Sequence, residues 1–300
     1  MSGYDPTRPR AGRLWYKAHG LGNDYLVVEE GDAWTLSPGA VERVCHRTRG
    51  VGSDGIVVLL AGGGPPFRLR MFNPDGGEFE RSGNGLRVLA SWLRRTGRVG
   101  TGGGPFDVEV GGEGVRMEVH AVEPGGVYDV SVAMGRARVG PEAVALDPAA
   151  LDPEGRLELP DVGPMALRPV SIGNPHAVVF TDDLTEEALH RLGPRIATHR
   201  AFAHGTNVQL ARPIDRRTVE ALIWERGVGP TSASGTSSCA VAVAAVHEGR
   251  LPAGEIEVRM EGGSLRVSVT EALDVVLRGP VQEVTTGELG EGFVRWLEGS

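Results

Sequence analysis

The sequence predicts a mixed α/β protein built from two pseudo-symmetric halves. A strand, a polar glycine-rich turn and a helix occur twice, at Arg68–Leu93 and at Thr218–Val246. Apolar and polar residues alternate along Phe106–Val132, as they do in antiparallel strands with one buried face. A length of 300 residues is sufficient for two domains. One plan used twice in a chain of this length indicates an internal duplication.

Both predicted helices begin at a small polar residue. Ser82 opens the run SGNG and Ser234 opens the run SGT. The first N–H groups of a helix lack intrahelical acceptors, and the helix dipole makes this end positive. Two such helix starts facing each other would bind one small anionic ligand between the halves. Serine is also a common N-cap residue, which explains each serine taken alone.

We expect the domain boundary near residue 130, where the pattern of the first half begins again. The expected organisation is a disordered tail at 1–12, an N-terminal domain at 13–130 completed by a C-terminal strand in 280–300, and a C-terminal domain at 131–279.

Periodic apolar residues predict two further helices. One covers Pro38–Arg49 and the other Leu184–Ala197, with its cap near Thr181 or Asp182. The segment from Asp274 to Val284 is expected to form two short strands separated by Gly279-Pro280, and the residues from Gly287 onward have only weak patterning.

The composition argues against several classes of function. A net charge of −8 disfavours nucleic acid as a partner, because phosphate binding needs a basic surface. No apolar run approaches the length of a membrane span. Lys17 is the only lysine, which disfavours pyridoxal phosphate chemistry because that cofactor needs a lysine amine. No nucleotide-binding glycine fingerprint stands between a strand and a helix, so a nicotinamide cofactor is not expected.

Cys45 and Cys239 are the only cysteines. They define no disulfide framework, and no signal peptide precedes them. We therefore expect a reduced, cytoplasmic protein. Cys45 falls on the apolar face of a predicted helix and is expected to pack in the core.

Three other residues carry weaker signals. Asn23 lies beside a glycine and is explained by a turn. Asp54, followed by glycine, is also only a turn signal. His176 follows a turn inside a strand, and a core or turn histidine is at least as good an explanation as a ligand role.

Six separated segments, in one order between about Leu14 and Leu289, resemble the diaminopimelate epimerase family, whose superfamily includes proline racemase. They are KAHGLGNDY, GVGSDGIVVL, MFNPDGGEFERSGNGLRVLA, SIGNPHAVVF, HGTNVQL and ERGVGPTSASGTSSCA. Each segment alone is a weak signal, whereas all six in sequence are highly specific.

The resemblance implies two similar α/β domains, each a barrel-like mixed sheet around a central helix. It implies interconversion of L,L- and meso-diaminopimelate in lysine and cell-wall synthesis, without cofactor or metal. One residue removes the α-proton and a second returns a proton on the other face. The implied partner is a small amino-acid substrate, and the resemblance allows a homodimer.

The resemblance also implies a set of site residues. Ser82 and Ser234 stand at the two proton-transferring positions. Arg226 would bind the carboxylate at the non-reacting end and Glu225 an ammonium group. Backbone N–H groups at the two helix starts would hold the reacting carboxylate. The full substrate-binding set is Asn23, Asn73, Gly83, Asn84, Asn174, Asn207, Glu225, Arg226, Gly235 and Thr236.

This chain departs from the family pattern at the reacting positions. The family has cysteine where Ser82 and Ser234 stand, and Cys239 matches a later position inside the helix. Pro230 replaces an acidic residue that the family usually carries. A serine hydroxyl is far harder to ionise than a thiol, whose reference pKa is about 8.5. A serine pair should therefore bind substrate well and epimerise it poorly or not at all.

Three interpretations of the serine pair stay open. In the first, the two cysteines of an active epimerase were replaced deliberately. In the second, the chain is a divergent racemase or dehydratase that uses His176, Asp75 or Glu225 as its base. In the third, it is a binding module that lost the reaction. Pro230 and the adjacent serines at 237–238 favour natural divergence, because a deliberate replacement would not need them.

Overall fold

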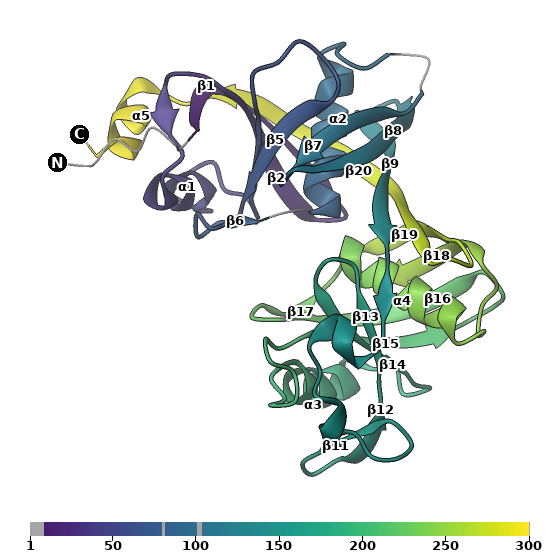
Figure 1. Cartoon of the computed structure of the whole chain (residues 1–300). Helices are drawn as coiled ribbons and strands as arrows, with labels where there is room; N and C mark the ends of the chain where they lie inside the picture. The colour runs from purple at the N-terminus through teal and green to yellow at the C-terminus, as the bar shows by residue number, and fades with distance from the viewer. Residues whose placement is uncertain (1–8, 80–81, 101–103, 300) are drawn as a thin grey trace. The chain divides into compact units, whose positions relative to one another are not determined.

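The computed structural model describes residues 9–79, 82–100 and 104–299 (Figure 1). These residues divide into two compact units. Unit 1 comprises the residues up to Val132 together with those from Pro280, and unit 2 comprises Ala133–Gly279. The chain enters unit 2 along β9 (Val127–Arg136) and leaves it along β20 (Asp274–Glu288).

Beside its parts of β9 and β20, unit 1 contains these elements: β1 (Arg10–Gly20), β2 (Asn23–Glu30), β3 (Trp34–Thr35), α1 (Pro38–Cys45), β4 (Ile56–Leu59), β5 (Phe67–Phe72), β6 (Glu78–Phe79), α2 (Gly83–Arg95), β7 (Phe106–Val110), β8 (Glu113–Glu123) and α5 (Glu291–Leu297).

Unit 2 contains these further elements: β10 (Arg138–Val139), the 3₁₀ helices η1 (Pro141–Val144) and η2 (Pro148–Ala150), β11 (Arg156–Leu159), β12 (Gly163–Ala166), β13 (Arg168–Ser171), β14 (Pro175–Phe180), α3 (Glu186–Ala197), β15 (Asn207–Pro213), β16 (Thr218–Glu225), β17 (Gly229–Thr231), α4 (Gly235–His247), β18 (Gly254–Met260) and β19 (Gly263–Val269).

The strands of unit 1 form a closed ring. In order around the ring, β1 pairs antiparallel with β2, β2 parallel with β4, β4 antiparallel with β5, and β5 parallel with β7. The antiparallel pairs β7–β8 and β8–β9 follow, β9 pairs with β20, and β20 returns antiparallel to β1. Figure 1 shows the first and last strands of the chain side by side in this unit. The sheet is therefore a barrel, which leaves few unpaired edges.

Unit 2 repeats the same series of pairings. β13–β14 is antiparallel, β14–β15 parallel, β15–β16 antiparallel and β16–β18 parallel. The antiparallel pairs β18–β19 and β19–β20 then follow. In each unit the two parallel pairs are joined through helices, α1 and α2 in unit 1 and α3 and α4 in unit 2. This agreement confirms the two pseudo-symmetric halves, and α2 and α4 occupy equivalent places.

The helices α2 and α4 are the central helices of their units. α2 packs against β1, β2, β4 and β8, and its Leu86, Leu89 and Leu93 are fully buried. α4 contacts β13 to β16, β18 and β19 and is almost entirely buried. Its small, apolar sequence has no polar face, as expected for a helix enclosed on all sides.

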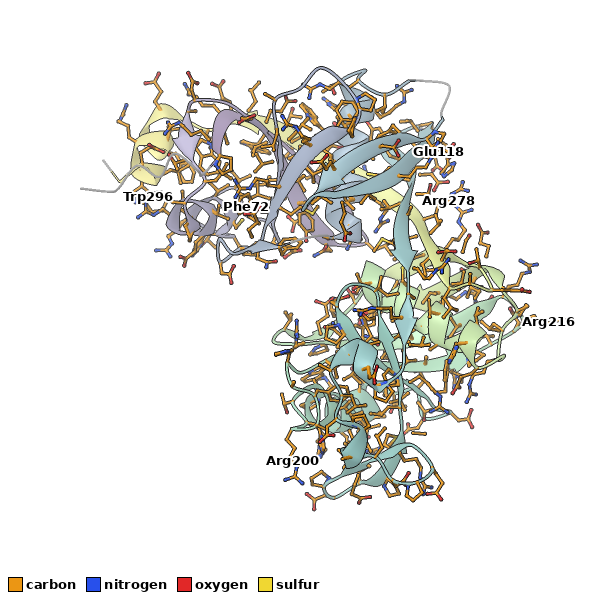
Figure 2. All side chains as sticks on the ribbon, viewed as in Figure 1. Phe72, Glu118, Arg200, Arg216, Arg278 and Trp296 are labelled. Atoms are coloured by element: carbon orange, nitrogen blue, oxygen red, sulfur yellow. The ribbon has the colours of Figure 1, made fainter. Side chains whose placement is uncertain are left out.

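Packed side chains fill the interior of both units (Figure 2). Phe72 lies in a core of unit 1 that also contains Trp34 and the buried face of α1. Arg216 of unit 2, by contrast, projects outward. Among the residues that the structure describes, no helix is long and apolar enough to cross a bilayer.

Several predicted boundaries were wrong. The N-terminal tail expected at 1–12 is part of β1 from Arg10, because Arg10 and Ala11 pair with β3; residues 1–8 lie outside the described part. α1 ends at Cys45 rather than Arg49, since His46 adopts an extended conformation. α3 begins at Glu186, capped by Thr185, whose hydroxyl accepts from the Ala188 N–H at 3.1 Å.

The C-terminal region also differs from the prediction. Gly279-Pro280 does not break the strand, and β20 is continuous. These two residues lie between the part of β20 paired with β19 and the part paired with β1, so neither of those ladders needs the N–H that proline lacks. The weakly patterned end contains α5, which packs on α1 through residues that include the buried Leu297.

Candidate active site

The first turns of α2 and α4 carry the two serines in different environments. Ser82 is the N-cap of α2 with φ −125° and ψ 125°, and its Oγ accepts a hydrogen bond from the Gly85 N–H at 3.1 Å. Ser234 has a similar backbone, φ −148° and ψ 128°, but its side chain makes no cap hydrogen bond. Its carbonyl oxygen instead accepts from the Ser238 hydroxyl at 2.8 Å. Ser82 Oγ is thus engaged as a cap, and Ser234 Oγ has no such role.

Asn23 approaches the α2 N-terminus from a tight hairpin. Leu21 and Gly22 form its two-residue loop with φ of 53° and 91°, the positive angles that a type I′ turn requires. Asn23 therefore begins β2 opposite Gly20. The Asn84 Nδ2, at the second position of α2, donates to Asn23 Oδ1 at 2.8 Å.

The α4 N-terminus has the corresponding contact. Asn174 follows the turn after β13, and its Nδ2 donates to the Oγ1 of Thr236, the second residue of α4, at 3.5 Å. In both units, an asparagine at the end of a connection between antiparallel strands therefore contacts the side chain at the second helical position. The repeated contact indicates that the two helix starts are equivalent beyond their shared serine.

His176 orients Asn174. Its Nε2 lies 2.9 Å from Asn174 Oδ1, and its Nδ1 lies 3.0 Å from Gln209 Nε2. Because the glutamine nitrogen only donates, Nδ1 accepts and Nε2 carries the proton toward Asn174. Burial lowers the pKa of His176 to about 3, so the ring is neutral at physiological pH. The same Gln209 nitrogen donates to Ser237 Oγ at 3.0 Å.

Asn207 and Arg226 form a third group. Asn207 Nδ2 donates to the Pro175 carbonyl at 3.0 Å, and its Oδ1 accepts from the backbone N–H of Arg226 at 2.9 Å. The exposed Arg226 guanidinium donates to the His204 carbonyl at 2.7 Å. Glu225 ends β16, next to Arg226. The Asn207 amide thus fixes the backbone that carries these two charged residues.

Asn73 and Asp75 occupy a separate turn after β5. Their side chains are exposed, and the Asn73 N–H donates to the Gly77 carbonyl at 2.8 Å. Asp75 Oδ1 accepts from the Gly77 N–H at 2.8 Å. No described contact joins them to the asparagines above, so their role in the site stays a prediction.

The cysteines form no disulfide. Cys45 Sγ accepts from the Ser53 hydroxyl at 3.3 Å, and burial raises the pKa of its thiol to about 11. Cys239 is fully buried within α4. A buried thiol of raised pKa is a structural group rather than a nucleophile or base.

Sequence reasoning missed four residues beside the site. Asp54 accepts from Asn23 Nδ2 at 3.0 Å, and Arg47 contacts Asp54. Arg87, fully buried on α2, donates to Asn84 Oδ1, and Gln209 holds His176. A buried arginine one turn into a central helix was the available signal, because arginine is rarely buried without a specific partner.

The sequence profile of the diaminopimelate epimerase family matches residues 15–140 and 169–284. The diaminopimelate epimerase of Desulforudis audaxviator is 40% identical over 277 residues, covering 91% of this chain and 97% of that protein. Diaminopimelate epimerase 2 of Nostoc sp. is 36% identical over 277 residues, covering 92% and 95%.

Solved structures have the same fold. A predicted epimerase from Pseudomonas aeruginosa superimposes with a TM-score of 0.68 at 23% identity, covering 93% of this chain and 99% of that one. A hydroxyproline epimerase from Agrobacterium vitis, with bound trans-4-hydroxy-L-proline, gives 0.65 at 13% identity, covering 93% and 92%. From the profile match over most of its length and its close relatives, the chain belongs to the diaminopimelate epimerase family, and it is an isomerase.

Proposed function

We propose that this protein binds diaminopimelate and interconverts its L,L and meso forms by proton transfer at one α-carbon. The proposal rests on the family and on two equivalent helix starts. Each has a serine at the cap and a second helical residue, Asn84 or Thr236, whose side chain contacts an asparagine of a neighbouring segment. Ser82 and Ser234 stand where the two proton-transferring groups would act. No cofactor or metal takes part in this scheme.

The remaining residues bind the substrate. Backbone N–H groups of Gly83, Asn84, Gly235 and Thr236 hold the reacting carboxylate, where the helix dipole also favours negative charge. Charge that develops on this carboxylate when the α-proton leaves is stabilised by the same groups. A guanidinium matches the two oxygens of a carboxylate, so Arg226 is suited to the distal end of the substrate.

Serine makes the proton transfer slow. A general base works best when its pKa is near the working pH, and an unassisted hydroxyl is far from it. His176 does not supply the missing base in this arrangement, because both of its ring nitrogens are hydrogen-bonded and its pKa lies near 3. We therefore expect binding with slow exchange of the α-proton.

A second candidate is a divergent member of the superfamily that acts on another amino acid. The hydroxyls that follow Ser234 favour it: Ser237 is bonded to Gln209, and Ser238 to the Ser234 carbonyl. Both hydroxyls therefore make buried hydrogen bonds within or beside α4. Such bonds are expected if serines in this segment arose by natural divergence.

The test is deuterium incorporation at the α-carbon in D₂O, followed by NMR, with L,L- and meso-diaminopimelate. We expect slow exchange by the parent chain. Replacing both serines, Ser82→Cys with Ser234→Cys, should raise the rate by on the order of 100-fold, since a positioned general base contributes roughly 10²–10⁴-fold. Ser232→Cys, an exposed serine near α4, is the matched control and should leave the rate unchanged.

The outcomes separate the candidates. No gain in the paired cysteine variant, together with no heat of binding for either isomer in calorimetry, would count against the proposal. Exchange into another amino acid but not into diaminopimelate would select the divergent enzyme. We also propose a cytoplasmic location and a homodimer; light scattering that gives the mass of one chain would exclude the dimer.

A further inference from the structure

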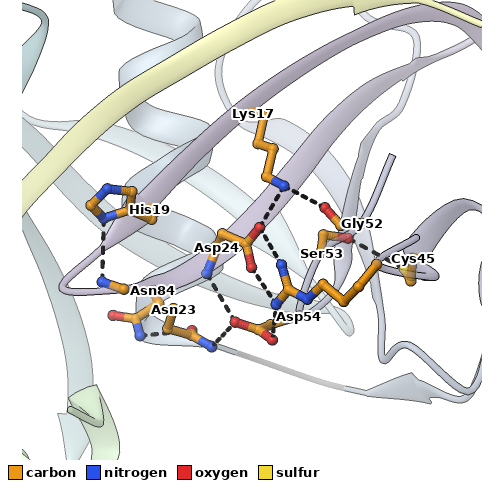
Figure 3. Close-up of polar contacts among 11 residues, drawn as sticks. Lys17, His19, Asn23, Asp24, Cys45, Gly52, Ser53, Asp54 and Asn84 are labelled. Atoms are coloured by element: carbon orange, nitrogen blue, oxygen red, sulfur yellow. Dashed lines mark hydrogen bonds and ion pairs between the residues drawn. The ribbon is translucent and has the colours of Figure 1, made fainter. Parts of the chain in front are cut away.

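A charged cluster in unit 1 lies next to the asparagines of the α2 N-terminus (Figure 3). Arg47 contacts both Asp24 carboxylate oxygens, at 2.7 and 2.8 Å, and Asp54 Oδ1 at 2.5 Å. Lys17 lies 2.9 Å from Asp24 Oδ2 and donates to the Gly52 carbonyl at 2.6 Å. Two carboxylates are thus balanced by two cations, which makes their partial burial tolerable.

From this cluster a chain of hydrogen bonds leads to α2. Asn23 Nδ2 donates to Asp54 Oδ2 at 3.0 Å, Asn84 Nδ2 donates to Asn23 Oδ1 at 2.8 Å, and Arg87 Nη2 donates to Asn84 Oδ1. The Asp24 N–H also donates to Asp54 Oδ2, at 3.0 Å. Every side chain in the series belongs to unit 1.

The two ends of this series determine its direction. An ionised carboxylate only accepts hydrogen bonds and a guanidinium only donates them, whereas an asparagine amide can do either. With Asp54 at one end and Arg87 at the other, both amides must point their nitrogens toward Asp54 and their oxygens toward Arg87. Each Nδ2 then donates one hydrogen within the series, and no residue in the described part of the chain accepts the other. Such donors suit a carboxylate.

We propose that Asp54 is a positioning residue that fixes the Asn23 amide and, through it, the Asn84 side chain, so that both present donors for a substrate carboxylate at the α2 N-terminus. This role in catalysis rests on the proposed function. The orientation of the amides does not, because it follows from the hydrogen-bond series alone.

Both carboxylate oxygens of Asp54 accept hydrogen bonds, Oδ1 from Arg47 and Oδ2 from Asn23 and the Asp24 N–H, which is the arrangement of an acceptor. Burial and the nearby Asp24 carboxylate raise the pKa of Asp54, and the Asp24 N–H and Arg47 oppose that rise. For Asp24, burial also acts to raise the pKa, but hydrogen bonds from Arg47 and Lys17 outweigh it and the pKa is lowered. Arg47 therefore serves both carboxylates, and Lys17 strengthens the ionised form of Asp24.

The chain packs so closely around Arg87 that there is no room for a side chain at Gly20. A Cβ at Gly20 would lie 2.7 Å from Arg87 Nη2 and 3.2 Å from Asn84 Oδ1. Arg87 Nη1 also donates to the Pro280 carbonyl at 2.9 Å, which fixes the guanidinium from the other side. A hydrogen bond to β20 thus holds the donor-only end of the series, and β1 lies close beside it at Gly20.

The test compares Asp54→Asn with Asp54→Glu, using the side-chain amide NMR signals of Asn23 and Asn84 and the kinetics of α-proton exchange. Asp54→Asn replaces an acceptor-only end by a group that also donates. It should shift both amide signals and lower kcat/KM by roughly 10- to 100-fold, with part of the loss in KM, because small misplacements of binding groups are costly. Kinetics are measured in the parent and in the paired cysteine variant.

Asp54→Glu keeps the acceptor. It should restore at least part of the parent's amide signals and part of its kcat/KM. Asp152→Asn, which makes the same change in an aspartate paired with Arg156 at 2.7 Å in unit 2, is the matched control and should change neither. Unchanged Asn23 and Asn84 signals in a folded Asp54→Asn chain would overturn the proposal, as would a loss of activity accompanied only by a loss of stability.

One measurement needs no variant. In the parent chain, one Nδ2 hydrogen of Asn23 and one of Asn84 should exchange with solvent more slowly than its geminal partner, since only one hydrogen of each is donated within the series. Equal exchange of both hydrogens would refute the series even if Asp54→Asn failed to fold. Failure of the proposed function would instead appear as absent α-proton exchange with these amide results intact.

Discussion

At the scale of single residues, Ser82 and Ser234 stand at equivalent points of the repeat but are bonded differently. Ser82 Oγ accepts from the Gly85 N–H, whereas Ser234 Oγ makes no cap bond. The first serine therefore has a structural role that would explain it without any chemistry. The second lacks that explanation, which strengthens its assignment as a reacting group.

This difference predicts unequal effects on stability. Ser82→Ala removes a side-chain cap and should lower the free energy of unfolding by about 1 kcal/mol, within the usual range of roughly 0.5–2 kcal/mol for such losses. Ser234→Ala removes no cap bond and should change it by less than about 0.5 kcal/mol. Urea unfolding of the parent and both variants measures this, and equal losses would show that the two serines act alike.

His176 predicts a dependence of stability on pH. Its pKa is about 3 in the folded chain and about 6.5 when unfolded, so between these values the unfolded state binds more protons. Its contribution to stability is complete above pH of about 6.5 and is lost as the pH falls toward 3, at up to about 1.4 kcal/mol per pH unit. Denaturant unfolding from pH 7 to pH 4 should show this slope reduced in His176→Gln.

The matched control for this measurement is His247→Gln, an exposed histidine at the end of α4. This variant should show the same dependence of the unfolding free energy on pH as the parent. If His176→Gln also keeps that slope, the buried ring is not what makes the protein sensitive to acid.

At the scale of elements, each central helix is also the crossover between two parallel strands. The connection from β5 to the parallel β7 contains β6 and α2, and the connection from β16 to the parallel β18 contains β17 and α4. Because each barrel encloses its helix, the helix start is fixed by core packing rather than by its own propensity. The position of each helix start therefore depends on the buried apolar side chains that pack around the helix.

A substitution that creates a cavity beside α2 tests whether this helix is packed in the core. Leu89→Ala, at a fully buried position, should lower the free energy of unfolding by roughly 2–5 kcal/mol. Leu14→Ala, in β1 with its side chain 67% exposed, removes the same atoms and should change it by less than about 0.5 kcal/mol. Similar values for the two variants in urea unfolding would contradict a central, packed α2.

At the scale of the whole molecule, the two units share one series of strand pairings but little sequence. The predicted site residues of the two units also differ. In unit 1 a series of amides lies between charged ends, and unit 2 contains a buried histidine, Arg226 and Glu225. A duplicated barrel has thus acquired a different polar environment around each helix start.

Ligand binding should stabilise the chain as a whole. At a meso-diaminopimelate concentration of about 100 times its Kd, the free energy of unfolding should rise by about 2.7 kcal/mol. Arg226→Ala should reduce this gain by raising the Kd roughly tenfold or more, since hydrogen bonds to charged groups are worth about 1.5–3 kcal/mol. Thermal unfolding with and without ligand measures it.

The control here is Arg216→Ala, an exposed arginine of unit 2 with no assigned role, which should leave the gain unchanged. An equal ligand effect in the parent and in Arg226→Ala would remove Arg226 from the binding site.

Much of the architecture could be predicted because it depends on patterns of residues close together in the sequence. The SGNG and SGT helix starts, the alternating strands and the repeated plan all depend on residues close in sequence. The errors fall where local signals are weak or are overridden: β1 extends because β3 pairs with it, β20 continues through Pro280, and α5 is a short helix held by its packing on α1.

The sequence by itself determined the family, the duplicated strand–helix plan and the two serines at the helix starts, because each is carried by residues adjacent in the chain. Only the tertiary structure decided that Asp54 orients Asn23, that Arg87 faces Asn84 and that His176 is buried and neutral. Hydrogen-bond partners and burial depend on which strands become neighbours when a barrel closes, and the spacing of residues along the chain does not determine that.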